Sequence, residues 1–177
     1  MYFFIADEHY WHGKIIIYSN RPFQNVVEMN EAIINNSNKI VGPNDVTIHA
    51  GDFTLLKPRD HDKIQEIIDR LNGRHVFLKG SHDYWIPRKR SMQIWEKQIN
   101  GEYVVVCHYA MHTWARSHYN SWHLYGHSHK DLELSGKRHC ISVENTNYQP
   151  ISFERVSEIM KEKSDNPNFL RKEDRRI

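Results

Sequence analysis

Residues 46–53 constrain the fold of this chain more than any other segment does. Their β-branched residues lead into Gly51 and Asp52, a pattern typical of a buried strand that ends in a polar side chain. A Gly-Asp pair alone usually marks a turn. Four other polar stretches also follow strand-like runs: Asp7-Glu8-His9, Gly80-Ser81-His82-Asp83, His108-Tyr109 and Gly126-His127-Ser128-His129. Five strand ends that carry Asp and His in one small domain predict a shared metal site.

Composition narrows the class of protein. With 177 residues and 39% hydrophobic content the chain can bury one core, and its formal charge of +2 argues against a strongly basic nucleic-acid binder. The 13 histidines favour metal binding or proton transfer. Two cysteines, Cys107 and Cys140, make a disulfide framework or a cysteine-based zinc site improbable. The amino terminus has neither a signal peptide nor a membrane-span pattern, so we expect a cytoplasmic protein that does not enter membranes.

The first half of the chain alternates strands and helices. Residues 2–6, 46–50 and 74–79 are expected strands, and hydrophobic spacing of three and four predicts helices over residues 25–40 and from about 61 to Gly73. Each of the two helices connects two of the strands. This alternation predicts an α/β layer with parallel crossovers.

The second half changes character. Asn100-Gly101 predicts a hairpin between the runs 92–95 and 102–107, and further strands are expected at 121–125 and 138–143. Ser152 is the expected amino-terminal cap of a last helix that runs through Met160. We therefore expect a single domain over residues 1–160 and a weakly ordered, charged tail over 161–177.

The five motifs, in this order, resemble those of the calcineurin-like metallophosphoesterase superfamily, and the match spans residues 2 to about 155. Asp7-x-His9-x-x-His12 and Arg21-Pro22-Phe23 are most similar to its small single-domain bacterial and phage members. The resemblance implies a four-layer αββα sandwich, in which two mixed β-sheets pack face to face between helices, the metallo-dependent phosphatase fold. It also implies a binuclear metal centre at the strand ends.

Residue by residue, the resemblance implies two metal sites that share Asp52. The first would use Asp7, His9 and His129, and the second Ser81, His108 and His127. Carboxylates and imidazoles suit two divalent ions, with Mn²⁺ favoured over Fe, Ni, Zn or Co. A metal-bound hydroxide would then be the nucleophile, His82 the general acid or transition-state stabiliser, and Asp83 the residue that orients the His82 ring.

Ser81 departs from the family pattern, which has asparagine at this position. A serine hydroxyl is a shorter and poorer ligand, so we expect a second site that is weaker, completed by water or partly empty. His12, Arg21 and Tyr109 are candidate substrate contacts, although a solvated loop role is equally open for Arg21. The histidine at position 49 is expected to be a strand residue that binds no metal.

The expected function is therefore a metal-dependent phosphoesterase, with phosphodiesters preferred because a short chain leaves the site open. The alternatives are a phosphomonoesterase or phosphoprotein phosphatase, and a catalytically impaired module that binds metal and phosphate. Aromatic residues near the ligands and the cations Lys79, Arg88, Lys89 and Arg90 suit a nucleotide or a nucleic-acid end as the substrate. Simple packing is the competing interpretation of those aromatic residues.

Overall fold

Two four-stranded sheets form the centre of the molecule in the computed structural model, which describes residues 1–171 and 173. The first sheet has the order β3-β2-β1-β8 and contains β1 (Tyr2–Ile5), β2 (Val46–His49), β3 (Arg74–Phe77) and β8 (Ile151–Ser152). The second has the order β4-β5-β6-β7 and contains β4 (Ile94–Ile99), β5 (Glu102–Cys107), β6 (Trp122–Tyr125) and β7 (Arg138–Cys140). Both sheets are mixed, with three parallel strands and one antiparallel edge strand each.

The two sheets pack face to face through alternate side chains of their strands. Phe4 and Ile48 project from the first sheet against Val104, Val106 and Leu124 of the second, and all five are fully buried. Helix α4 (Phe153–Glu162) adds its apolar face to the same core. This central core fixes the position of each strand end relative to the others.

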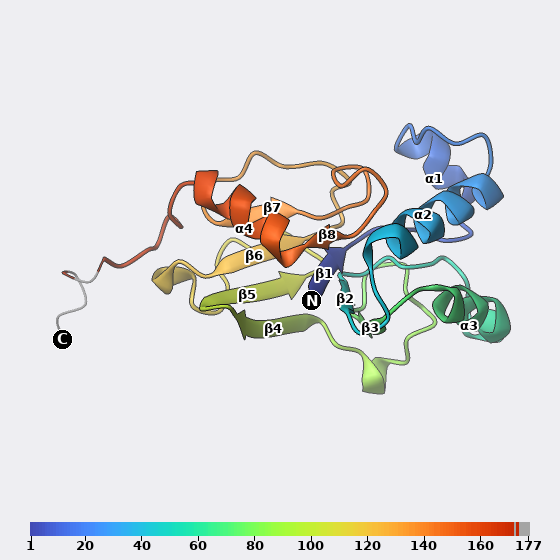
Figure 1. Cartoon of the computed structure of the whole chain (residues 1–177), viewed down its shortest axis with the longest axis horizontal. Helices are drawn as coiled ribbons and strands as arrows, with labels where there is room; N and C mark the ends of the chain where they lie inside the picture. The colour runs from blue at the N-terminus through green and yellow to red at the C-terminus, as the bar shows by residue number, and fades with distance from the viewer. Residues whose placement is uncertain (172, 174–177) are drawn as a thin grey trace.

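The outer face of the first sheet is covered by helices α2 (Val26–Ile40) and α3 (His61–Arg70), which lie on the right in Figure 1. The side chain of Asn25 caps α2 by accepting from the amides of Val27 and Glu28. A short helix, α1 (Gly13–Tyr18), was not predicted, because six residues are too few to show a helical period.

The predicted fold class is confirmed: two mixed sheets lie between flanking helices. The predicted hairpin is also present, with Asn100 and Gly101 both at positive φ as a tight antiparallel turn requires. Single turns of 3-10 helix occur in the loops at η1 (Pro58–Asp60), η2 (Arg88–Arg90) and η3 (Ser117–Tyr119). Among the described residues, no helix combines the length and apolar character that crossing a membrane requires.

The polar segment after α4 differs from the expected weakly ordered tail. Asn166 is buried, and its side chain donates to the carbonyls of Ser117 and Ser121 while accepting from the amide of Lys137. One buried amide thus fastens this segment to the second sheet, a contact that composition does not reveal. Residues 172 and 174–177 of the predicted tail lie outside the described part of the chain.

Candidate metal centre

The strands deliver the predicted ligands to one edge of the two packed sheets. Asp7 and His9 follow β1, and Asp52 follows β2, which is parallel to β1. His108 follows β5, and the 127–129 segment follows β6, which is parallel to β5. Because the carboxyl ends of parallel strands meet at the same edge, residues far apart in the sequence gather into two Asp/His clusters.

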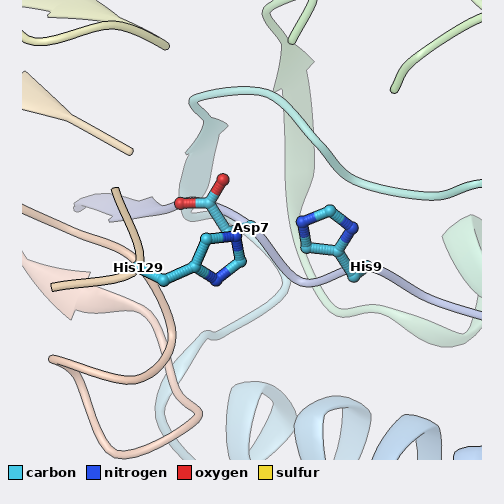
Figure 2. A group of neighbouring side chains, drawn as sticks. All are labelled: Asp7, His9 and His129. Carbon is cyan, nitrogen blue, oxygen red and sulfur yellow. The ribbon is translucent and has the colours of Figure 1, made fainter. Parts of the chain in front are cut away.

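We call Asp7, His9 and His129 the first cluster. One donor atom of each residue lies within 4.8 Å of the other two. Figure 2 shows the carboxylate of Asp7 and the two imidazole rings gathered around a common space. The ring of His9 stacks on that of His129, with centroids 5.1 Å apart. A carboxylate and two imidazoles could hold a transition-metal ion.

Asp52, His108 and His127 form the second cluster, whose donor atoms also lie within 4.8 Å of one another. Asp52 and His108 are buried, whereas His127 is exposed. The Nδ1 atom of His108 lies 2.9 Å from the carbonyl oxygen of Ala50, which suits an Nδ1–H donor and leaves Nε2 as the ligand atom. This second group of one carboxylate and two imidazoles could also hold a metal ion.

Asp52 of the second cluster also faces His9 of the first cluster. Its Oδ2 atom is 3.8 Å from Nε2 of His9 and 3.4 Å from Nε2 of His108. Within the described part of the chain, both of these imidazole nitrogens are buried without a hydrogen-bond partner. Buried polar atoms normally have partners. Two unpartnered imidazole nitrogens near one carboxylate oxygen are what we expect of residues that bind cations.

The backbone at these residues is unusual. Five of the six cluster residues, all except His108, have φ between 53° and 67°, in the left-handed region that residues with side chains seldom adopt. These five cluster residues therefore sit at sharp turns directly after their strands. Glycines permit the close approach of these turns: a Cβ atom at Gly126 would lie 2.6 Å from Oδ2 of Asp7, and one at Gly80 would collide with the Asp52 carboxylate.

Residues outside the clusters hold the first cluster in place. Glu144 accepts hydrogen bonds from Nε of Arg21 at 2.9 Å and from Nδ1 of His129 at 2.8 Å. With Nδ1 donating to Glu144, Nε2 of His129 is the atom left for a metal. The hydroxyl of Ser142 donates to Oδ2 of Asp7. We missed Glu144 and Ser142 in the sequence, although both lie at the end of a predicted strand, the same signal that identified the ligands.

The structure corrects the role predicted for Arg21. Its guanidinium is buried and donates to the carbonyls of Asp7 and Glu8 as well as to Glu144. These bonds occupy the group that was expected to contact phosphate. Arg21 therefore positions the turn that carries the first cluster.

The role predicted for Asp83 is also wrong. Its carboxylate accepts from the amides of Gly80, Asp52, Phe53 and Thr54 and from the indole of Trp85, and among the described residues it makes no hydrogen bond to His82. Asp83 is fully buried beneath the turn after β2. It therefore holds Asp52 in position and does not orient His82.

The remaining predicted residues border the clusters. The ring centroid of His82 lies 5.4 Å from that of His9 and 6.0 Å from that of His12. Nδ1 of His12 lies 3.1 Å from Nδ1 of His9. The hydroxyl of Ser81 is 3.0 Å and 3.3 Å from the two Asp52 oxygens. Tyr109 is exposed against the rings of His108 and His127.

Burial and neighbouring charges set the pKa values of the cluster residues. Burial raises the pKa of Asp7 to about 6 and lowers that of His9 well below its ordinary value. Burial opposes ionisation of Asp52 as well, but His108, the His82 amide and His9 lower the pKa of its carboxyl group overall. Asp52 is therefore a carboxylate and His9 a neutral imidazole, the protonation states in which these residues bind metals.

A buried pair lies beside the first cluster. Oε1 of Glu8 is 2.5 Å from Nδ1 of His49, and Nε2 of His49 is 3.0 Å from Nδ1 of His75. Burial raises the pKa of Glu8 to about 8 and lowers that of His49 to about 3, so at neutral pH the pair shares one proton and carries no net charge. As predicted, His49 is a strand residue, the last of β2, and it lies outside the two clusters.

A cavity of about 630 Å³ opens elsewhere, along β8, with His139, Asn145 and Arg155 among its lining residues. It shares no lining residue with either cluster. The cavity and the two Asp/His clusters are therefore two different candidate sites. We assign the candidate site to the clusters, because their buried donor atoms converge.

Fold and site together define an α/β protein with two mixed sheets and two adjoining Asp/His clusters, each able to hold a metal ion. No family model matches the sequence. The "Uncharacterized protein MJ1445" of Methanocaldococcus jannaschii is 31% identical over 165 residues, which cover 89% of this chain and 90% of that protein. The chain therefore belongs to the same family as this archaeal protein.

One solved structure shares the fold. The protein of unknown function AQ665 from Aquifex aeolicus superposes with a TM-score of 0.70 at 23% identity, over 90% of this chain and 98% of the other. A conserved uncharacterized protein from Streptococcus pneumoniae TIGR4, described as a predicted phosphoesterase, reaches a TM-score of 0.41 at 13% identity, over 80% and 70% of the two chains. The second likeness is too low to bear on function, and the first supports the fold alone.

Proposed function

We propose that this protein is a metal-dependent phosphoesterase that prefers phosphodiesters and resembles the calcineurin-like metallophosphoesterases. The observation that carries the proposal is the position of Asp52, whose Oδ2 atom lies between the unpartnered Nε2 atoms of His9 and His108. A carboxylate that faces both clusters could hold two metal ions close together, as a binuclear site needs.

The donor set fits two divalent ions of the Mn²⁺ class. Asp7, His9 and His129 would hold one, His108 and His127 the other, and Asp52 both. When bound, such ions activate water as the nucleophile and neutralise the charge of phosphate oxygens. Ser81 would contribute little as a ligand, because its hydroxyl lies against the Asp52 carboxylate.

The chain's own residues would bind and protonate the substrate. His82 is half-buried beside His9 and His12, close enough to the first cluster for its ring to donate a proton to the leaving oxygen. His12, on the same side, would donate to a phosphate oxygen. Because His127 and Tyr109 are exposed, the second cluster leaves room for a second ester group, which favours diesters over monoesters.

Two observations favour a second candidate, a module that binds metal and phosphate without turnover. The Ser81 hydroxyl lies within hydrogen-bonding distance of both oxygens of the carboxylate that the two clusters would share. In addition, Asp83 does not hold the ring of His82, so the proposed acid lacks the partner predicted for it. Turnover separates this candidate from an enzyme.

The test is hydrolysis of bis(4-nitrophenyl) phosphate and of 4-nitrophenyl phosphate with Mn²⁺. The proposal predicts faster release from the diester, loss of the reaction with a chelator, and a fall of at least about 100-fold in His82→Gln, the lower end of the range for general acid catalysis. His61→Gln, which changes an exposed histidine of α3, is the matched control. Faster release from the monoester would favour a phosphomonoesterase, and bound metal without turnover would favour the binding module.

A further inference from the structure

Aromatic residues near the clusters divide into two groups. Tyr10 and Trp114 are buried, and Trp85 packs against Phe53 and Phe77 while its indole donates to Asp83. By contrast, Tyr18, Tyr84 and Tyr109 are exposed to 71%, 54% and 45%. Packing explains the first group. The second group presents ring surface to solvent beside the proposed site, where a substrate could cover it.

Exposed tyrosines border both clusters. The ring centroid of Tyr109 lies 4.8 Å from those of His108 and His127, the two imidazoles of the second cluster. Tyr18 meets His12 edge-on at 6.5 Å, and His12 in turn contacts His9 of the first cluster. A phosphate held between the clusters would therefore have an aromatic surface near each of its two ester groups.

Positive charge lies next to the third tyrosine. The amide of Tyr84 donates to the carbonyl of His82, and the Nζ atom of Lys57 sits 3.6 Å above the centre of the Tyr84 ring. The same loop continues into Arg88-Lys89-Arg90, all exposed, and projects from the domain between β3 and β4 (Figure 1). Lys79, which was expected to add positive potential, instead anchors this loop through the carbonyl of Ile86 at 2.7 Å.

We propose that the substrate is single-stranded nucleic acid. One base stacks on Tyr109 and another on Tyr18 or Tyr84, while Arg88, Lys89 and Arg90 contact phosphates further along the strand. Aromatic faces and a cationic stretch are the two features with which proteins hold single strands, whereas bases inside a duplex offer no free face for stacking. Binding of the strand follows from the surface alone, and its cleavage rests on the proposed phosphodiesterase activity.

Cleavage at this site is a hydrolysis. The oxygen of a water molecule bonds to phosphorus, and the bond from phosphorus to one nucleoside oxygen breaks. A proton passes to that leaving oxygen, for which His82 is the proposed donor. The products are two shorter strands, one of which carries a terminal phosphate monoester.

Binding is measured by fluorescence anisotropy with Mn²⁺ and a labelled ten-nucleotide phosphorothioate oligothymidylate, and repeated with an abasic strand of equal length and charge. We expect the abasic strand to bind more weakly. Tyr109→Ala should weaken binding of the thymidylate by about 5- to 150-fold, the range for loss of one stacked base. It should leave the abasic strand almost unaffected. Tyr119→Ala, an exposed tyrosine of η3, is the matched control and should change neither.

The cationic loop is tested by salt dependence. Neutralising Arg88, Lys89 and Arg90 to glutamine should lower the slope of log affinity against log salt by about 2, since each phosphate contact with a single strand contributes about 0.7. The control replaces Lys39, Lys97 and Lys161, which are exposed on other elements, and removes the same charge. Equal slopes for the two triple variants would overturn the proposal, as would equal affinity for thymidylate and abasic strands.

The two proposals fail in different ways. If bis(4-nitrophenyl) phosphate is hydrolysed but neither strand binds, the nucleic-acid proposal is wrong and the phosphodiesterase stands. If the thymidylate binds through Tyr109 but no diester is hydrolysed, the binding surface stands and the enzymatic function is wrong.

Discussion

The two Asp/His clusters differ in how firmly the rest of the chain holds them. In the first, Ser142 and the His127 amide donate to Asp7, and Glu144 fixes the ring of His129 and is itself held by Arg21. In the second, Asp83 supports Asp52 through the backbone and the Ala50 carbonyl orients His108, but His127 is exposed. Ligands that are already oriented lose less freedom when a metal binds. The first cluster should therefore bind its ion more tightly than the second.

The largest effect is expected at Asp83, the residue that supports Asp52 of the second cluster. Asparagine at this position would replace one accepting oxygen with an amide that faces backbone N–H groups. Hydrogen bonds to a charged group contribute about 1.5–3 kcal/mol each, so Asp83→Asn should lower the free energy of unfolding by about 3 kcal/mol. Urea denaturation measures this loss, with Asp62→Asn on the exposed face of α3 as the control. Equal stability of the two variants would show that Asp83 does not support the turn.

A somewhat smaller effect should come from Glu144, which distinguishes the clusters. Glu144→Gln weakens the hold on His129 and leaves the Arg21 guanidinium without its charged partner. Because second-layer partners of metal ligands contribute about 10- to 100-fold in affinity, the tighter Mn²⁺ site should weaken by about 30-fold. Calorimetric titration checks this against Glu154→Gln on α4. If the weaker site changed instead, our assignment of the two affinities would be reversed.

The Ser81→Asn substitution should make the two clusters more alike in their affinity for Mn²⁺. The longer side chain carries an amide oxygen that can reach a metal, whereas the Ser81 hydroxyl lies against Asp52. We expect the weaker Mn²⁺ site to tighten by about tenfold, with a matching gain in diester hydrolysis at limiting Mn²⁺. Ser157→Asn on α4 is the control. No change in metal affinity would mean that this position does not face the second ion.

The smallest expected effect is a pH dependence of stability beside the first cluster. Without metal, folded Glu8 and His49 share one proton up to about pH 8, and the unfolded pair also holds one between pH 4.5 and 6.5. Above pH 6.5 the pair loses its proton in the unfolded state, whereas the folded state keeps the proton up to about pH 8. The stabilisation from the raised pKa of Glu8 is therefore lost as the pH rises through about 8.

Between pH 6.5 and 7.5 this loss amounts to about 1 kcal/mol, since one proton per pH unit corresponds to about 1.4 kcal/mol. Urea unfolding of chelator-treated protein at the two pH values measures it. In the Glu8→Gln variant, the decrease in the free energy of unfolding between these two pH values should be smaller. Parallel pH profiles for the two proteins would contradict a shared proton in this pair.

The sequence predicted which residues gather in the two clusters, because a strand end is a local pattern. A hydrophobic run followed by Asp or His predicts that this side chain lies at the end of a strand, and Asp7, Asp52 and His108 fit this pattern. The helices over residues 26–40 and 61–70 were predictable for the same reason, since their periods are local.

The supporting contacts could not be predicted in this way. Arg21 and Glu144 are 123 residues apart, and no local pattern records that they meet. Asp83 follows His82 directly, yet its carboxylate accepts from backbone amides around residue 52, because the turn brings those donors to it. Because Asp83 is adjacent to His82 in the sequence, we expected these two side chains to interact. In the fold, the carboxylate of Asp83 instead accepts from backbone amides of other residues.

Titration of the metal-free protein with Mn²⁺ by calorimetry, beside Asp52→Ala, tests the central claim most directly. If two sites share Asp52, each chain should bind two ions, the first more tightly than the second. In the variant both affinities should fall by at least about 100-fold, which exceeds the effect of losing a residue that only contacts a metal ligand. One ion per chain, or a variant that keeps either site at full strength, would contradict a centre built around this carboxylate.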